Sequence, residues 1–300
     1  MSLLDNFWVS TLRDTVTNWL EDKAFRLGAA LAFFSMFSIA PLLLIVVSLM
    51  GLFFGRTEAR AELEEELGNF LSPEAAETLL NLADHAQRTG DSLWATIAGI
   101  VALVFGATGV FGQLQDALNS IWGVKAKPKK SWLHMIRKRL LSFSMVLVIG
   151  FLLLVSLALS TLLSSLTGLA SDYFNLPSWT VSGLDLGVSF LVVAILFAFI
   201  FKVLPDAKVR WRDVRLGALV TAGLFVLGKF FLAWYLGRES TTSAYGAAGA
   251  FVLVLLWIYY SSLILFLGAE FTQAYVRNSG DTIEPSRHAV KVKTTELEGI

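Results

Sequence analysis

Ionisable side chains within long apolar segments are the residues of this sequence most able to do chemistry. Lys229 lies between Gly228 and Phe230, and Glu270 ends another apolar run. Inside a bilayer such groups are costly, and they tend to mark an ion or substrate path or to pair with one another. A third acid, Asp116, lies near the end of a further apolar segment. These three residues are the first candidates for a transport path.

Lys229 is predicted to lie in the outer half of a bilayer. It follows the basic residue Arg215 by 14 positions, or about 21 Å of helix. Its ammonium group can attract an anionic group within a path, or it can snorkel toward the outer interface beyond Leu236. The sequence leaves both interpretations open. A direct pair with Glu270 is not expected, because that acid belongs to the inner half.

Glu270 precedes Arg277 by seven positions, or about 10 Å of helix, which places it in the inner half. Asp116 can share this depth. Two acids at one level can bind a proton or a cation, or each can pair with an inner-loop arginine such as Arg137 or Arg139. Both possibilities follow from the spacing.

Two further residues are candidates for a path. Pro41 removes a backbone donor and kinks the first apolar segment, and Ser38 is placed to satisfy the freed groups. Kinked helices can line cavities, although many only pack. Tyr245 lies at the outer entrance of the last segment, where it is either an interface anchor or a path residue.

The elements that position these residues follow from composition. Of the 300 residues, 55% are hydrophobic and 16% are charged, and mean hydropathy is +0.65. Soluble domains have roughly 25% charged residues, and crossing a bilayer takes about 20 apolar helical residues. Six segments meet this requirement: residues 28–54, 93–112, 140–167, 186–204, 216–236 and 247–275. The sequence therefore predicts an all-α, polytopic membrane protein with six transmembrane helices in a single domain, residues 1–277.

The placement of lysine and arginine sets the orientation. They are concentrated before the first segment, between the second and third, between the fourth and fifth, and after the sixth. The opposite loops hold only Arg56, Arg60, Arg88 and Arg238. Because basic loops stay in the cytoplasm, both termini are predicted to be cytoplasmic.

Residues 1–27 are predicted to form an amphipathic helix on the cytoplasmic membrane surface. Apolar side chains recur at every fourth position, namely Leu4, Trp8, Leu12, Val16 and Leu20. Tryptophans suit the headgroup region. The alternative is that this stripe packs on another protein element.

Two other segments lie outside the predicted bilayer. Residues 57–91 are acidic and fit an outer hairpin of two short helices, the first capped by Thr57 and the second beginning at Ser72 and Pro73. The polar tail, residues 278–300, has no periodicity and is predicted to be a disordered cytoplasmic tail.

The sequence offers little to an enzyme. Its histidines, His85, His134 and His288, fall on an outer loop, an inner loop and the tail, so they cannot share a metal. Cysteine is absent, which excludes thiolate chemistry. Walker A, HExxH and GxSxG motifs are also absent. The zero net charge gives no basic field for nucleic acid. We expect no catalytic activity, metal, cofactor or nucleic-acid partner.

Four strings of the sequence resemble the BrkB/YihY family of envelope proteins: AFFSMFSIAPLL, DALNSIW, LPDAKVRWRD and YGAAGAFVLVLLWIYYSSLILFLGAE. The resemblance covers nearly the whole chain. It implies a protein of the bacterial inner membrane linked to envelope integrity and serum resistance, from a family once labelled ribonuclease BN. The residues contradict that label, because metal-dependent RNA hydrolysis needs clustered His and Asp ligands on a cytoplasmic domain.

The architecture favours a transporter-like protein that moves a lipid or a small hydrophobic or anionic solute, a step made by analogy. Membrane lipids are then its partners. The alternative is a non-transporting scaffold that organises other envelope proteins. A membrane-bound hydrolase is the weakest hypothesis, because the acids that it would need are dispersed: Asp116, Asp172, Asp185 and Glu270.

Overall fold

The computed structural model describes residues 7–37, 55–70, 76–81, 109–127, 178–236 and 241–292. These residues are mostly helical. The helices are α1 (Phe7–Glu21), α3 (Arg56–Phe70), α7 (Ser178–Val203), α8 (Trp211–Leu236) and α9 (Thr241–Asn278). Residues 24–37, 76–81 and 109–121 are also helical. The strands are β1 (Val124–Ala126), β2 (Ala207–Lys208), β3 (Glu284–Pro285) and β4 (Ala289–Lys291).

Within the described residues, three helices are long and apolar enough to cross a membrane. They are Leu186–Val203, Trp211–Phe231 and Phe251–Asn278, which match the fourth, fifth and sixth predicted spans. A shorter apolar helix, Ala24–Phe37, covers the start of the first predicted span. The third predicted span and most of the second lie outside the described residues.

The helix α8 begins at Trp211, five positions before its predicted start. Its first turn is polar, with Asp213 buried and held by Arg210 through an Nε to Oδ2 contact of 2.9 Å. An acid in the first turn is favourable at a helix N-terminus. Hydropathy marks only the apolar part of such a helix, which explains the earlier start.

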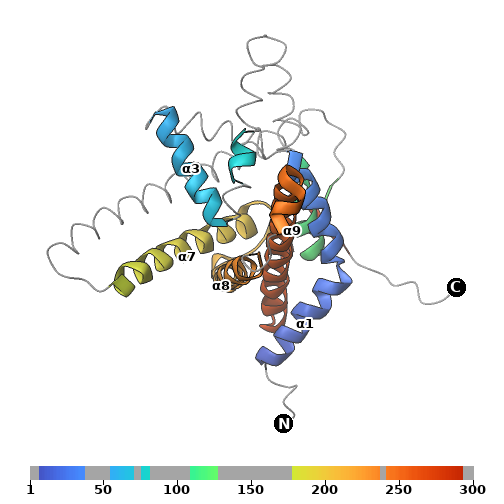
Figure 1. Ribbon diagram of the computed structural model, residues 1–300. Coiled ribbons are helices and arrows are strands. Elements are labelled where there is room, and N and C mark those ends of the chain that lie inside the picture. The colour runs from blue at the N-terminus through green and yellow to red at the C-terminus, as the bar shows by residue number, and fades with distance from the viewer. Residues whose placement is uncertain are drawn as a thin grey trace.

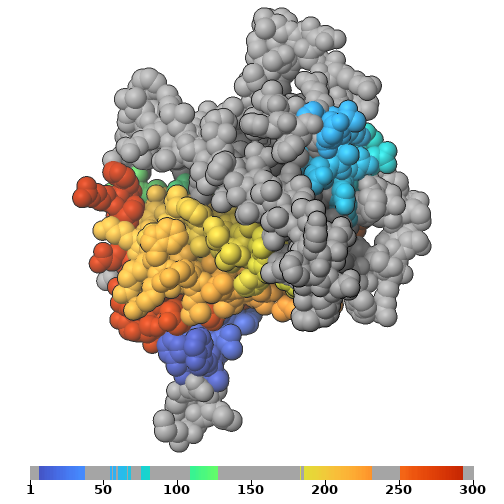
Figure 2. All heavy atoms as spheres, turned by 90° about the vertical axis from the view of Figure 1, so that its left-hand side faces the viewer, coloured from blue at the N-terminus to red at the C-terminus, as the bar shows by residue number. Residues whose placement is uncertain are grey.

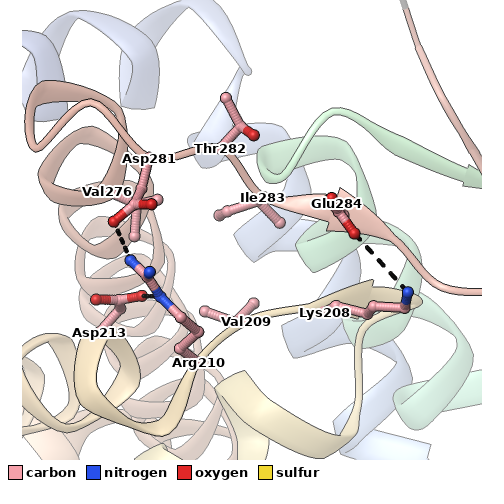
Figure 3. A pocket seen from close by; sticks show the side chains of 9 residues that line it. All are labelled: Lys208, Val209, Arg210, Asp213, Val276, Asp281, Thr282, Ile283 and Glu284. Atoms are coloured by element: carbon pink, nitrogen blue, oxygen red, sulfur yellow. Dashed lines mark hydrogen bonds and ion pairs between the residues drawn. The ribbon is translucent and has the colours of Figure 1, made fainter.

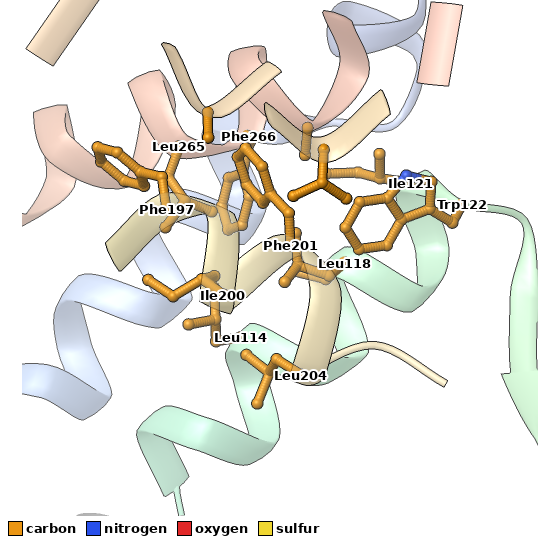
Figure 4. Close-up of a cluster of buried hydrophobic side chains, with 14 of the residues drawn as sticks. Leu114, Leu118, Ile121, Trp122, Phe197, Ile200, Phe201, Leu204, Leu265 and Phe266 are labelled. Carbon is orange, nitrogen blue, oxygen red and sulfur yellow. The ribbon is translucent and has the colours of Figure 1, made fainter. Parts of the chain in front are cut away.

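Consecutive helices pack against each other in the order of the chain. The helix α7 contacts α8, α8 contacts α9, and α1 lies beside the Asn278 end of α9 (Figure 1). The central cluster of buried side chains comes from the helices 24–37 and 109–121 and from α7, α8 and α9; Figure 4 labels members from 109–121, α7 and α9. Phe201 and Phe266 have no exposed surface, and the ring of Trp122 meets Phe201 edge-on at 6.1 Å between centroids.

The helices α7 and α8 form part of the surface seen in Figure 2, and large apolar side chains of both helices are exposed. On α7 these include Leu191 and Ile195, and on α8 Leu227 and Phe230. A helix that is apolar on all sides is typical of a core or a membrane span. The exposed residues are therefore suited to contact lipid.

The chain after α9 forms a C-terminal clip, which we define as residues 279–292. It turns at Gly280, whose φ is 76°, and then pairs with two distant segments. Strand β3 pairs antiparallel with β2, and β4 pairs antiparallel with β1. The clip thus joins the end of helix 109–121 to the connection between α7 and α8.

The clip corrects the prediction of a disordered tail over residues 278–300. Strands of two or three residues are too short for a pattern in the sequence, and their pairing depends on partners that lie far away in the chain. The polar composition that suggested disorder is therefore compatible with order here. Residues 293–300 lie outside the described part of the chain.

The segment predicted as a hairpin contains α3 and the helical residues 76–81. Arg60 Nη2 donates to Asn81 Oδ1 at 3.0 Å, which joins the two pieces. Leu79 and Leu80 are buried, whereas the acids Glu62 and Glu65 are exposed. The acidic face of α3 is thus solvated.

Candidate functional site

Glu270 is a buried acid on α9. None of its surface is exposed, and among the described residues no nitrogen or hydroxyl group donates a hydrogen bond to Oε1 or Oε2. It precedes the end of α9 at Asn278 by eight positions, or about 12 Å. Burying a carboxylate without partners costs several kcal/mol. Packing alone therefore does not explain this residue.

The polar group that faces Glu270 is a second carboxyl group, that of Asp22. The two side chains lie within hydrogen-bonding reach of each other. Asp22 belongs to the turn between α1 and the Ala24–Phe37 helix, where Lys23 has a φ of 57°. A carboxylate only accepts hydrogen bonds, so two carboxyl groups can bond to each other only when one carries a proton. We call Asp22 and Glu270 the acid pair.

Asp22 is only partly buried, but its surroundings favour the protonated form. Burial raises the pKa of Asp22 above its ordinary value, the charge of Glu21 raises it further, and the hydrogen bond with Glu270 acts in the opposite direction. The net result is a raised pKa, because desolvation disfavours the charged form of an acid.

The cation on α9 nearest to Glu270 is Arg277, and it is paired with a different acid. Arg277 contributes an attractive charge at Glu270, yet its Nη2 atom forms an ion pair with Asp14 Oδ2 at 3.0 Å. Burial alone would raise the pKa of Asp14, but hydrogen bonds from Asn278 and Arg277 outweigh burial and lower it. Asp14, eight positions before Asp22, is therefore a satisfied carboxylate, unlike the acid pair.

Polar contacts along the seam between α1 and α9 hold the acid pair in place. Asn278 Nδ2 donates to Thr11 Oγ1 at 3.1 Å, and Asn18 Nδ2 donates to Gln273 Oε1 at 3.4 Å. Farther along, Trp19 Nε1 donates to the carbonyl of Leu263 at 3.2 Å. These contacts lie on both sides of Glu270 along α9, so the turn containing Asp22 cannot slide along the helix without breaking them.

The opposite face of α1 carries the apolar stripe. Thr11 and Thr15 are buried against the protein, while Trp8, Leu12, Val16 and Leu20 are each more than half exposed, at 51%, 56%, 52% and 54%. The stripe predicted from the sequence thus points away from the described residues. The small and polar face, which the pattern did not single out, makes the contact with α9.

A different seam fixes the rotation of α9 against α8. A Cβ atom on Gly217 would lie 1.8 Å from Thr272 Oγ1, and a Cβ on Gly268 would lie 1.8 Å from Thr221 Oγ1. Each threonine hydroxyl donates to the carbonyl of the glycine four positions earlier, at 2.6 Å in α8 and 2.8 Å in α9. Small residues allow such close helix contacts.

This Gly–Thr seam decides where Glu270 points. Gly268 and Thr272 face α8, and Glu270 lies midway between them in sequence. A helix rotates about 100° per residue, so Glu270 is about 200° from Gly268. Its side chain is therefore directed away from α8 and toward α1.

Two of the recognised sequence strings meet at Asp206. Its Oδ2 atom accepts hydrogen bonds from Asn119 Nδ2 at 3.0 Å and from Gln115 Nε2 at 3.4 Å, and its backbone N–H donates to Asn119 Oδ1 at 2.8 Å. DALNSIW and LPDAKVRWRD are thus parts of one polar contact. Asp206 is thus an acid with hydrogen-bond donors, which contrasts with Glu270.

A polar cavity of about 370 Å³ lies beside this contact, between the clip and the start of α8 (Figure 3). Arg210 pairs there with Asp213 and Asp281, and Lys208 Nζ lies 3.8 Å from Glu284. A hydrogen bond from Arg210 lowers the pKa of Asp281. Each acid that lines the cavity has a basic partner, so its groups serve to fasten the clip.

The structure places the predicted site residues at different levels. Lys229 is partly buried on α8 beside Gly228, which contacts Tyr260 of α9. Tyr260 is ten positions from Glu270, or about 15 Å of helix. The structure therefore keeps Lys229 and Glu270 apart, as the sequence analysis expected.

Of the remaining candidates, only Asp116 has a described side chain, and it is not brought together with Glu270. Asp116 is exposed on helix 109–121, and the acid that faces Glu270 is Asp22 instead. Tyr245 lies in α9, but its side chain is outside the described part, as is all of Pro41. The interpretations of these three residues stay predictions.

Sequence reasoning missed Asp22. A usable signal was present, because the predicted topology puts the start of the first span and the last third of the sixth at the same inner level. The depth argument made for Glu270 and Asp116 applies equally to Asp22. The contact itself depends on the turn at Lys23, which no local pattern indicates.

The profile of the family described as "Virulence factor BrkB" matches residues 15–293, which include the acid pair and the whole clip. The chain belongs to this family.

Several bacterial membrane proteins are similar over most of the chain. "UPF0761 membrane protein MS0032" of Mannheimia succiniciproducens is 30% identical over 84% of this chain and 84% of its own length. "UPF0761 membrane protein RSc1559" of Ralstonia nicotianae is 31% identical over 83% of the chain, and a protein of Alkalilimnicola ehrlichii is 29% identical over 85%. The chain spans only 55% of the length of these last two relatives. No solved structure matches.

Proposed function

We propose that this membrane protein is transporter-like and moves a lipid, or a small hydrophobic or anionic solute, across or within the bilayer. The observation that carries the proposal is Glu270, a fully buried acid without a donor among the described residues, in a helix apolar enough to span. Ionisable groups in that setting are costly, and they tend to mark pathways and proton relays.

The proposal includes a placement in the bacterial inner membrane with six spans and both termini in the cytoplasm. The three described spans and the one-sided distribution of lysine and arginine support this placement. In this orientation α1 lies along the inner surface. Its exposed stripe, Trp8 to Leu20, then enters the headgroup region.

Lys229 is proposed to act at the other end of the path. It lies about 15 Å from the level of Glu270, in the half of the bilayer assigned to the outer leaflet. A cation at that depth can attract an anionic headgroup or carboxylate. We propose no catalytic activity, no metal, no cofactor and no nucleic-acid partner.

The test uses the full chain reconstituted in vesicles that contain a fluorescent phosphatidylglycerol. Movement between leaflets is measured from the fraction that an external reductant bleaches. Wild type is expected to move the probe faster than empty vesicles, whereas Glu270→Gln is expected to lose most of this activity. Glu65→Gln, on the exposed face of α3, is the matched control and is expected to keep it.

Lys229→Met provides an independent arm of the same assay. The substitution keeps an unbranched side chain one atom shorter and removes its charge, so it is expected to slow an anionic probe more than a zwitterionic one. If neither Lys229→Met nor Glu270→Gln changes movement, the proposed path is wrong. The alternative, a scaffold, predicts no probe movement by wild type and a stoichiometric protein partner.

A further inference from the structure

We propose that Asp22 and Glu270 share a proton and form a proton-binding site. The inference deepens the proposed function by naming the coupling ion, and it rests on that function only where proton binding is linked to transport. The site combines a fully buried carboxyl group and a partly buried one, contributed by α9 and by the turn after α1.

The contacts of the pair favour a proton over other ligands. No nitrogen or hydroxyl donor reaches Glu270 within the described residues, so the contact between the carboxyl groups requires a shared proton. Ca²⁺ and Mg²⁺ need six or more ligands, and the described residues contain no group of three or more acids and histidines placed to hold a metal. The pair offers too few ligands for such an ion.

Among the described residues, the charged groups around the pair do not neutralise it. Glu21 adds a further negative charge, and Arg277, which attracts from α9, is bound to Asp14. The pair therefore has the arrangement of two coupled carboxyl groups, which titrate as one unit rather than separately.

The two acids have unequal access to water. Asp22 is partly exposed and is flanked by exposed Glu21 and Lys23, while Glu270 has no exposed surface. A proton can thus enter at Asp22 and reside between the two groups. Loss of the proton leaves two negative charges in contact, and their repulsion favours separation of the turn at Lys23 from α9.

Infrared difference spectroscopy of the full chain in lipid tests the site without any transported solute. Spectra are recorded over a pH series, and the observable is the carbonyl stretch of a protonated carboxyl group in a water-poor environment. Wild type is expected to lose this band as pH rises. Glu270→Gln and Asp22→Asn are each expected to abolish the pH-dependent band, and Glu65→Gln is expected to retain it.

Several results would overturn the proposal. One is the absence of the band in wild type at every pH, and another is its survival in both single variants. A third is a shift of the titration when sodium replaces choline at constant ionic strength, since that would make the pair a cation site. Asp22→Asn changes a partly exposed side chain, so it keeps the test valid if Glu270→Gln does not fold.

The vesicle assay separates this inference from the proposed function. If the band behaves as expected but probe movement is independent of pH, the proton site is correct and its coupling to transport is wrong. If the band is absent while Glu270→Gln still stops movement, Glu270 serves transport without holding a shared proton, and this inference fails alone.

Discussion

The helix α9 makes two seams with opposite character. Toward α8, Gly268 and Thr272 interlock with Thr221 and Gly217, and each threonine hydroxyl is satisfied by a carbonyl of its own helix. Toward α1, Glu270 meets Asp22 without a donor from the described residues. Close packing with satisfied groups is typical of structural contacts, and a buried unsatisfied acid is typical of a working site. The helix α9 thus has one side that packs closely against α8 and another side that carries the candidate site.

The largest effect is expected from Gly217→Ala in the α8–α9 seam. Its new methyl group would overlap Thr272 Oγ1, and overpacking of this kind costs about 1–3 kcal/mol. Thr272 cannot turn away without losing its hydrogen bond to Gly268. The measurement is the free energy of unfolding of the purified chain in detergent.

Gly223→Ala is the matched control on the same helix, because a Cβ there meets nothing within 4 Å. It is expected to be neutral or to stabilise by up to about 1 kcal/mol through helix propensity. The double variant Gly217→Ala with Thr272→Ala removes the closest clash and should recover part of the loss. Equal effects of the two glycine substitutions would mean that the helices do not interlock.

The next largest effect is expected from Asp206→Ala. Unlike Glu270, this acid accepts two side-chain hydrogen bonds, from Asn119 and Gln115. Leaving a buried donor such as the Asn119 amide unsatisfied costs about 1–3 kcal/mol. Thermal unfolding followed by circular dichroism gives the change. A neutral outcome would show that Asp206 is no better satisfied than Glu270.

A smaller, pH-dependent effect is expected from Asp22→Asn. The raised pKa of Asp22 means that the folded chain binds more protons than the unfolded chain between the ordinary value and the raised one. Stability is therefore expected to fall as pH rises through this window. Asp22→Asn should remove that part of the slope in unfolding measured over a pH series.

Asp14→Asn provides the opposite sign on the same seam. The lowered pKa of Asp14 contributes stability that is present above the ordinary value and is lost as pH falls through the lowered one. Removing Asp14 should therefore flatten the acid side of the profile. If both variants change the same side, the assignment of the two acids is wrong.

The smallest energetic effect is expected on the exposed face of α1. Because the chain has no cysteine, single-cysteine variants can carry a spin label without background. Leu12→Cys and the neighbouring Arg13→Cys should each change stability by only about 0.5 kcal/mol or less. In vesicles the label at position 12 should be accessible to oxygen, and the label at position 13 to a water-soluble nickel complex. The reverse pattern would place the stripe against protein or water.

The sequence predicted the parts of the fold that depend on composition over long windows. The spans of α7, α8 and α9 follow from runs of apolar residues, and the exposed stripe of α1 follows from its four-residue period. The α8–α9 seam could not be read in this way, because GxxxT spacing indicates close contact without naming the partner helix. The register of this seam is known only from the structure, in which Gly217 and Thr272 interlock.

The sequence singled out one of the two acids of the candidate site. Glu270 stands out in the sequence because it is an acid within an apolar run, and its inner level follows from the distance to Arg277. Its partner was not identified, because Asp22 lies in a polar stretch where an acid is unremarkable. The clip was missed for a related reason: β3 and β4 depend on strands far away in the chain.

The free energy of unfolding of Glu270→Gln, relative to wild type at neutral pH, tests the contrast between the two seams most directly. If the acid has no ionic partner in the fold, the neutral amide keeps its shape and the variant should be at least as stable as wild type. A loss of about 3–5 kcal/mol, the usual result of breaking a buried ion pair, would contradict the account. Glu270 would then be a structural residue like Asp206.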